Sequence, residues 1–592
     1  MTAPQFDVRW EGDAGPFEVT LLTERCTDGV EEVQIILQAD APFPPPPLAL
    51  RWSVPVVDIQ SHWTTAAGWN RGNGTPWSHG VTSKATSNAP VVCLHNLAGR
   101  NRLTFAFSDA LNAVRLTANV VEETARFDCA LALFPEPGPP VTHYTATLRL
   151  DTRDVPYWGA LGDVQAWWAS LPGCAPSPVP EVARQPMYST WYSFHQSLTL
   201  EGIETQCRLA KEIGCEAMIV DDGWQTADSG RGYAYCGDWE ASPARIPDMK
   251  AHVARVHDLG LKYLLWYSVP FVGVHSKAWG RFHDTFLTII DMGGQVGVLD
   301  PRFPEVREYL ITTYERAVRD WDLDGLKLDF VDSFHGPAPH SGGASRRDYA
   351  SVPEAVDRLL TDVMARLRAI KPDIMIEFRQ SYVGPLMRKY GNMFRAGDCP
   401  DDALTNRQRT LDIRLLCGDT AAHADMMMWH PDEPTEAAAL QLINTLFAVP
   451  QISVLLDQIP PDHLEMVRWW LAWWKGHRGV LLDGSLTPLH PEAMYPVVIA
   501  ADARKKIIAA YADAVLPLAD APGEVWIVNG TPGERLVLEL PQPLGDRTLT
   551  VRDCRGRTVR EEMMTLSTGP RALPVPPSGT IHLSAPEGDK DR

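Results

Sequence analysis

The chain has 592 residues, 45% of them hydrophobic and 22% charged, which is typical of a soluble protein with more than one globular domain. Its net charge of −20 disfavours nucleic acid and anionic membranes as partners and suits a neutral substrate such as a sugar. No secretory signal, no apolar run near the roughly 20 residues of a membrane span and no Cys-x-x-Cys pair is visible, so we expect a cytoplasmic protein without a zinc or redox motif.

Residues 1–180 are predicted to form a β-sandwich. Short apolar runs alternate there with turns of Gly, Pro, Asp and Asn, as in two sheets that pack face to face. The loop at 61–77 is polar and glycine-rich and carries Trp63, Trp69 and Trp77. A loop of this kind either covers the pocket of a neighbouring domain or is an ordinary surface loop with its tryptophans packed beneath it.

A proline-rich linker at 171–186 precedes a change of pattern. Across residues 186–480, apolar runs alternate with segments of helical spacing, which predicts a central (β/α)₈ barrel. A doubly wound sheet is the alternative, but no glycine-rich phosphate or dinucleotide loop follows any predicted strand. The eight predicted strands lie at 187–191, 217–222, 262–267, 325–330, 373–378, 392–395, 424–429 and 451–456.

The last part of the chain, residues 485–592, returns to short alternating strands separated by Gly and Pro turns. We therefore expect an N-terminal β-sandwich at 1–180, a catalytic barrel at 186–480 and a smaller C-terminal β-sandwich at 485–592. In such a barrel the chemistry lies at the carboxyl ends of the strands, so the residues there are the first candidates for a site.

The fourth predicted strand carries two charged residues within a buried pattern. Leu326, Leu328 and Phe330 alternate with Lys327 and Asp329, which is the period of a strand. A lysine and a carboxylate on one face of a buried strand are costly unless they are paired or functional. Lys327 can keep Asp329 ionised, and an ionised aspartate at a strand end is a competent nucleophile; the alternative is a structural ion pair.

The other predicted strands also end in carboxylates, basic residues and aromatics. This combination is expected of a glycoside hydrolase, which directs one carboxylate at the anomeric carbon and a protonated carboxyl at the leaving oxygen. Aromatic faces can receive the sugar ring, although core packing is the favoured explanation for most of the 20 tryptophans. The candidates are Trp191, Tyr192, His195, Asp221, Asp222, Trp266, Lys327, Asp329, Asp332, Glu377, Arg379, Arg395, Asp398, Asp401, Asp402, Trp429, His430 and Asp457.

Three of these segments occur in an order that resembles a known family. They are Asp-Asp-Gly-Trp at 221–224, Leu-Lys-Leu-Asp at 326–329 and Phe-Arg-Ala-Gly-Asp at 394–398. Together they resemble glycoside hydrolase family 36, the melibiase or α-galactosidase group of clan D, whose three-part architecture is similar to the one expected here. The resemblance implies a retaining α-glycosidase that hydrolyses terminal α-linked galactosides by double displacement, and we expect no cofactor and no metal.

The resemblance also implies roles for single residues. Asp329 resembles the nucleophile and Asp398 the general acid/base, while Lys327 and Arg395 resemble the basic residues close to each of them. Asp221 and Asp222 resemble the pair that binds the sugar's 4- and 6-hydroxyls. The other candidate substrate contacts are Trp266 as a platform, Trp63 or Trp69 lent by the N-terminal domain, Trp191 and Asp401.

This chain departs from the family in three places. The Cys- and Gly-rich segment that usually contacts the 2-hydroxyl side is replaced by Glu-Phe-Arg-Gln-Ser-Tyr at 377–382. The fourth-strand motif continues as Phe-Val-Asp at 330–332. The acid/base motif has an extra residue in Asp-Cys-Pro-Asp-Asp-Ala at 398–403, which leaves Asp401 as a rival for the acid. The clan and the mechanism are therefore better supported than the exact sugar.

Other functions remain open at this point. Within the same chemistry they are a transglycosylase of the raffinose-synthase type and a glycosidase for N-acetyl-α-galactosaminides, β-L-arabinopyranosides or α-glucosides. A divalent-metal enzyme is a different class, and Lys327 and Arg395 argue against it because cations beside a metal site are unfavourable. A non-catalytic carbohydrate-binding protein would not need both aspartates. The expected partner is an oligosaccharide or glycoside substrate, and a homo-oligomer is left open.

Overall fold

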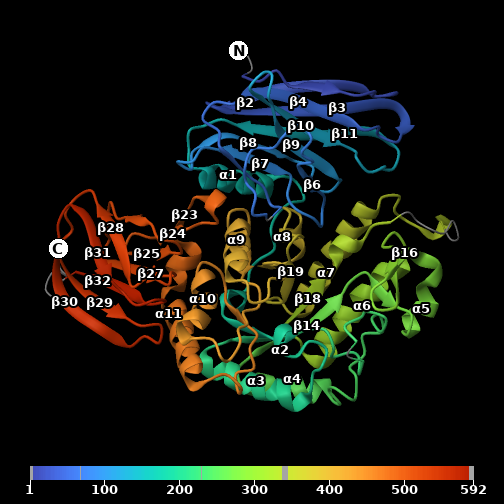
Figure 1. The fold of residues 1–592 in the computed structure, drawn as a ribbon. Coiled ribbons are helices and arrows are strands. Elements are labelled where there is room, and N and C mark those ends of the chain that lie inside the picture. Colours follow the sequence, from blue (N-terminus) through green and yellow to red (C-terminus); the bar gives the residue numbers. More distant parts are fainter. Residues whose placement is uncertain (1–4, 67, 229, 337–343, 586–592) are drawn as a thin grey trace.

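The computed structural model describes residues 5–66, 68–228, 230–336 and 344–585. An N-terminal pair of sheets lies above a central barrel, and a C-terminal pair of sheets lies beside that barrel (Figure 1). The expected fold, a (β/α)₈ barrel flanked by two β-sandwiches, is confirmed. None of the described helices is both long and apolar enough to cross a bilayer.

Two antiparallel sheets form the N-terminal sandwich because alternate side chains of their strands are apolar. In β3, for example, Val33, Ile35 and Leu37 are buried, and Gln34 between them is exposed. The six-stranded sheet has the order β2 (Glu18–Thr27), β3 (Val30–Phe43), β11 (Val141–Asp151), β8 (Asn101–Phe107), β7 (Val91–His95) and β5 (Ser61–Trp63). The five-stranded sheet has the order β1 (Arg9–Glu11), β4 (Leu48–Pro55), β10 (Arg126–Leu133), β9 (Val114–Val121) and β6 (Val81–Ser83).

Eight parallel strands form the barrel, and their short apolar runs are buried on both faces, as parallel sheets require. A parallel bridge between His423 and Val449 brings the two edges of the sheet together. The order is β21 (Ala421–His423), β20 (Met393–Arg395), β19 (Met375–Arg379), β18 (Gly325–Asp329), β14 (Lys262–Ser268), β13 (Ala217–Val220), β12 (Met187–Ser189) and β22 (Gln451–Ile452).

The predicted seventh strand, at 424–429, is wrong. The strand is β21, which ends at His423, and the apolar Met426 and Met427 that suggested a strand are buried in the loop after it. Trp429 and His430 therefore do not stand at a strand end. The Trp429 indole donates to His463 at 3.1 Å, and the His430 side chain is 71% exposed.

Polar side chains cap the start of several barrel helices. Thr199 accepts from the Gly202 N–H at the start of α3, and Asp248 accepts from the Ala251 N–H at the start of α4. Gly214, with φ of 102°, ends α3 in a conformation that favours glycine. The helices are α1 (Tyr157–Ser170), α2 (Trp191–Phe194), α3 (Leu200–Ile213), α4 (Met249–Asp258), α5 (Lys277–Phe282), α6 (Pro304–Trp321), α7 (Val352–Ile370), α8 (Met387–Tyr390), α9 (Ala403–Arg414), α10 (Thr435–Asn444) and α11 (Pro461–Asp483).

Two further groups of strands complete the fold. After β14, a small antiparallel sheet of β15 (Phe271–Gly273), β17 (Gln295–Leu299) and β16 (Phe286–Asp291) is inserted into the barrel. The C-terminal sandwich has a sheet of β23 (Ser485–Leu489), β24 (Val497–Ala501), β25 (Lys505–Ala510), β27 (Glu524–Asn529), β32 (Thr580–Ser584), β29 (Gly545–Arg552) and β30 (Thr558–Leu566). Its second sheet contains β26 (Val515–Pro517), β28 (Arg535–Leu540) and β31 (Gly569–Pro574).

Candidate active site

Asp329, the last residue of β18, is buried at the carboxyl end of the barrel, with 6% of its surface exposed. Its carboxylate accepts hydrogen bonds from Trp266 Nε1 at 3.1 Å, from Arg379 Nε at 2.8 Å and from the Tyr382 hydroxyl. Burial alone would raise the pKa of Asp329, but Arg379, Lys327 and the donated hydrogen bonds outweigh it and hold the pKa well below its ordinary value. Asp329 is therefore an ionised carboxylate in a site that excludes most water.

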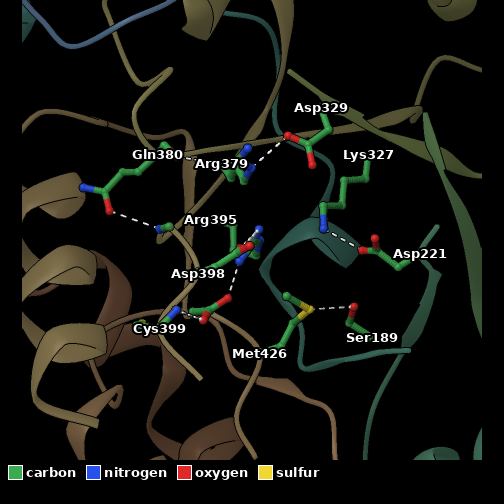
Figure 2. A network of polar contacts seen from close by, with 12 residues as sticks. Ser189, Asp221, Lys327, Asp329, Arg379, Gln380, Arg395, Asp398, Cys399 and Met426 are labelled. Carbon is green, nitrogen blue, oxygen red and sulfur yellow. Dashed lines mark hydrogen bonds and ion pairs between the residues drawn. The ribbon is translucent and has the colours of Figure 1, made fainter. Parts of the chain in front are cut away.

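Lys327 lies two residues before Asp329 on the same strand, but its ion-pair partner is Asp221 of the loop after β13. Lys327 Nζ is 2.5 Å from Asp221 Oδ2, and both side chains are buried. Figure 2 shows this pair beside Asp329. The expectation that Lys327 keeps Asp329 ionised holds only through its charge, because the lysine's hydrogen bond goes to Asp221.

Asp222 is held by two side-chain amides. Gln196 Nε2 and Gln225 Nε2 each donate to its carboxylate at 2.6 Å. Burial raises the pKa of Asp222 to about 6, although the two amide donors oppose this shift. Asp221 and Asp222 thus form a buried pair of hydrogen-bond acceptors at the end of β13, which is the property that a clamp on sugar hydroxyls needs.

Trp266 contacts the site through its N–H rather than through an open ring face. Its side chain is 1% exposed, and its ring centroid lies 6.0 Å from those of Tyr233 and Trp239 and 6.4 Å from that of Phe330. The observed role of Trp266 is to donate to Asp329.

Arg395 at the end of β20 connects three carboxylates. It donates to Asp398 Oδ1 at 2.9 Å and to Asp425, and its Nε lies 3.7 Å from Glu377 Oε1. Figure 2 shows Arg395 and Asp398 across the barrel mouth from Lys327 and Asp221. A guanidinium that is 1% exposed among carboxylates fixes the position of each of them.

Asp398 is the most exposed of these carboxylates, with 48% of its side chain accessible. Partial burial raises its pKa and Asp329 adds to this effect, but Arg395, Lys327 and Arg379 outweigh both and leave the pKa below its ordinary value. Asp398 is therefore ionised at neutral pH in the unliganded protein. Arg409 Nη1 of α9 donates to the backbone carbonyls of Gly397 and Asp398, both at 2.9 Å, and so holds this turn.

Asp425 belongs to the site, although the sequence suggested no role for it. It is fully buried and accepts from Tyr192 Oη at 2.8 Å, from the Cys399 N–H at 2.6 Å and from Arg395. Burial raises the pKa of Asp425, and Arg395 opposes the shift. The misplaced seventh strand hid this residue, because Asp425 follows the true strand β21 at the barrel mouth.

Several candidates have hydrogen-bond partners outside this cluster. Trp63 is fully buried and donates to Asp412 Oδ1 at 2.9 Å and to Tyr495 Oη at 3.1 Å, so it packs between the three parts of the chain and does not present a face to a sugar. Asp401 accepts from Gln441 Nε2 of α10 at 3.1 Å. Asp402 is the N-cap of α9 and accepts from the Thr405 N–H at 2.9 Å.

The remaining two tryptophan candidates have different surroundings. Trp69 is 61% exposed, and the neighbouring Gly68 carbonyl accepts from Gln408 Nε2 of α9 at 2.5 Å, so its loop rests on the barrel. Trp191 begins α2 and is partly buried, with its ring centroid 4.2 Å from that of His195. Both stay candidates for substrate contact.

A family model described as Melibiase matches residues 182–386. This part of the barrel is similar to the melibiase family. The matched range contains Asp221, Asp222, Trp266, Lys327 and Asp329, and it ends before β20 and β21.

Known proteins with detectable similarity include several α-galactosidases and a blood-group galactosaminidase of Flavonifractor plautii, which is 23% identical over 26% of this chain and 15% of that protein. "Alpha-galactosidase 2" of Pediococcus pentosaceus is 26% identical over 200 residues, which is 32% of this chain and 27% of that protein. The match thus spans about a quarter of the relative's length.

Solved structures resemble the whole chain. The α-galactosidase AgaA of Geobacillus stearothermophilus, in complex with 1-deoxygalactonojirimycin, has a TM-score of 0.66 at 16% identity and covers 96% of this chain and 81% of its own. A variant of AgaA in complex with stachyose has a TM-score of 0.63 at 14% identity, with 98% and 88% covered. At such identities the likeness establishes the fold.

Proposed function

We propose that this protein is a retaining α-glycosidase that hydrolyses terminal α-galactosides. The observation that carries the proposal is Asp329: a buried, ionised carboxylate at the end of β18, with cations and hydrogen-bond donors arranged to keep it ionised. Such a group is a nucleophile that needs no further activation. The names of the α-galactosidase relatives and the sugar complexes of the AgaA structures support the choice of substrate class.

In the first step, an Asp329 oxygen attacks the anomeric carbon while the bond to the leaving oxygen breaks. Asp398, after it has taken up a proton from solvent, gives that proton to the leaving oxygen, so the aglycone leaves as an alcohol and a glycosyl ester remains on Asp329. Asp221 and Asp222 accept hydrogen bonds from sugar hydroxyls. Their two buried carboxylates beside Lys327 suit a neutral sugar, because the lysine balances one of their charges.

In the second step, Asp398 takes a proton from water as that water attacks the anomeric carbon. The bond between carbon and Asp329 breaks, and the electron pair returns to the carboxylate. Esterification removes the negative charge of Asp329, so the cations Arg395, Lys327 and Arg379 then act on Asp398 without that opposition and favour its ionised form. Two inversions give net retention of configuration.

The decisive experiment combines substrate and stereochemistry. A panel of p-nitrophenyl α-galactoside, α-glucoside, β-L-arabinopyranoside and N-acetyl-α-galactosaminide identifies the sugar, and NMR during early turnover identifies the first anomer released. We expect hydrolysis of the α-galactoside with the α-anomer appearing first. Release of the β-anomer first would contradict the double-displacement assignment of Asp329 and Asp398. Cleavage of another glycoside in the panel, without cleavage of the α-galactoside, would change the proposed substrate and leave the proposed mechanism in place.

Analysis of the products formed from raffinose distinguishes hydrolysis from transfer. Free galactose as the main product supports the hydrolase, whereas longer oligosaccharides formed even at low raffinose concentration would support a transglycosylase. We propose that the protein acts in the cytoplasm on soluble oligosaccharides.

A further inference from the structure

The two oxygens of Asp329 are not equivalent. Oδ1 accepts from Arg379 Nε at 2.8 Å, from the backbone N–H of Phe330 at 2.8 Å and from the Tyr382 hydroxyl. Among the described residues, Oδ2 accepts one hydrogen bond, from Trp266 Nε1 at 3.1 Å. The three donors occupy the lone pairs of Oδ1. Oδ2 is therefore the oxygen available to attack a sugar.

The donors on Oδ1 are rigidly placed. Tyr382 is fully buried, and the Arg379 guanidinium lies 5.3 Å from the ring centroids of both Tyr382 and Phe330. Arg379 Nη1 also donates to the Gln380 carbonyl at 3.2 Å. Phe330 has φ of 62°, the left-handed conformation in which its own N–H turns back to Asp329. None of these donors contacts Oδ2.

We propose that Arg379 and Tyr382 are positioning residues that hold Oδ1 and thereby speed the second chemical step, the departure of Asp329 from the sugar. The inference rests on the proposed function. It assigns a purpose to the segment after β19, which takes the place of the Cys- and Gly-rich segment of the resembling family.

The physical reason is the change of charge on Oδ1 along the reaction. When Oδ2 bonds to the anomeric carbon, the carboxylate becomes an ester and Oδ1 becomes a neutral carbonyl oxygen. When water adds to that carbon and the bond to Oδ2 breaks, the negative charge returns to the carboxylate, and water's proton goes to Asp398. Hydrogen bonds to an ionised acceptor are about twice as strong as those to a neutral one. The donors on Oδ1 therefore oppose ester formation and favour ester cleavage.

The test is pre-steady-state kinetics with p-nitrophenyl α-galactoside, whose leaving group needs little assistance. Tyr382→Phe removes one donor and keeps the ring, and Arg379→Lys keeps the charge but loses the Nε contact. In both variants we expect the ratio of the glycosylation to the deglycosylation rate constant to rise about tenfold or more. The signs are a burst of one equivalent of p-nitrophenolate and a glycosyl-protein visible by intact mass. Azide, a better nucleophile than water, should shorten the lifetime of that species.

Tyr188→Phe is the matched control. Tyr188 is a buried barrel tyrosine whose hydroxyl contacts Ser193 and the Val454 carbonyl, away from Asp329. It reports what loss of a buried phenol hydroxyl does to the fold, and it should leave the ratio of the two rate constants unchanged. Thermal unfolding of all three variants identifies any that do not fold, and the other Oδ1 variant then carries the test.

Two failures can be told apart. If the unmodified protein hydrolyses glycosides but both Oδ1 variants slow the two steps equally, or show no burst, the inference is wrong and the proposed function stands. If the unmodified protein cleaves none of the glycosides in the panel, the proposed function falls and the inference falls with it.

Discussion

Lys327 of β18 reaches across β14 to pair with Asp221 after β13, and not with Asp329 on its own strand. The pair joins the end of β18, which carries Asp329, to the end of β13, which is followed by Asp221 and Asp222. A neutral variant at either end leaves a buried, unpaired charge at the other, so the geometry of both strand ends depends on one contact.

Asp329→Gly should lose essentially all hydrolysis, by about 10⁴-fold or more, because no other group can form the covalent intermediate. Azide should restore part of the turnover of activated aryl galactosides and give a glycosyl azide of inverted configuration. The product is measured by NMR. Near-normal activity in the variant would take the nucleophile role from Asp329.

Asp221→Asn and Asp222→Asn should raise KM and lower kcat together. Contacts to sugar hydroxyls are present in both complexes and strengthen as the ring gains positive charge in the transition state. We expect kcat/KM to fall about 10²-fold or more. Steady-state kinetics on the α-galactoside measure the effect. If kcat/KM is unchanged in both variants, the pair has only a structural role.

Asp398→Ala should be severe for sugars with poor leaving groups, by about 10²- to 10⁴-fold, and mild for the first step on p-nitrophenyl glycosides, whose phenolate needs no proton. The lowered pKa of Asp398 adds a pH dependence. Because the acid must be protonated and the free protein holds it ionised, kcat/KM for poor leaving groups should rise as the pH falls below 7. The same measurement on Asp398→Ala should lack this rise, and its persistence would assign the acid to another group.

The raised pKa of Asp222 predicts that the stability of the protein depends on pH. Its folded-state pKa is about 6 and its ordinary value is 3.8, so its burial favours the protonated form. The stability associated with this proton is fully present below pH 3.8 and is lost as the pH rises through about 6, by about 3 kcal/mol. The unmodified protein should therefore lose unfolding free energy at this group between pH 4 and pH 7. Asp222→Asn removes the titrating group, so its unfolding free energy should not show this loss. Urea unfolding at the two pH values measures the difference, and parallel behaviour of the two proteins would contradict it.

Asp412→Asn tests the interface that Trp63 forms. Asp412 is buried, accepts from Trp63 and Tyr495, and pairs with Arg71 at 2.5 Å. Removing its charge leaves Arg71 unpaired, and the expected loss is about 3–5 kcal/mol of unfolding free energy. Trp69→Ala, at an exposed position on the same loop, is the control and should change the unfolding free energy little. If Asp412→Asn changes the unfolding free energy as little as Trp69→Ala does, the contacts of Asp412 contribute no stability.

The arrangement of strands and helices could be predicted from the sequence because hydrophobic periodicity fixes it. The strand ends at Asp221 and Asp329 followed from the same pattern, since a charge stands there directly after a buried run. The error at the seventh strand has a physical cause. Met426 and Met427 are apolar because they are buried in a loop, and a short apolar run does not distinguish a loop from a strand.

The partners of the site residues could not be predicted in the same way. Trp63 was expected at the sugar because a tryptophan in a polar loop suits a binding surface, and its partner Asp412 lies 349 positions further along the chain. The contacts of Arg379 and Tyr382 with Asp329 likewise depend on how two neighbouring strands lie side by side. Sequence patterns report local geometry and burial, and they do not report which distant groups meet.

The second half of helix α9 contacts different parts of the molecule within one turn. Arg409 supports the turn that carries Asp398, while Asp412, less than one turn away, is bound by Trp63 and Arg71 of the N-terminal sandwich and by Tyr495 close to β24. The helix that supports Asp398, the proposed general acid, is thus bound by segments outside the barrel. A barrel excised from its flanking sandwiches would consequently lose the partners of Asp412, on the helix that supports the turn of Asp398.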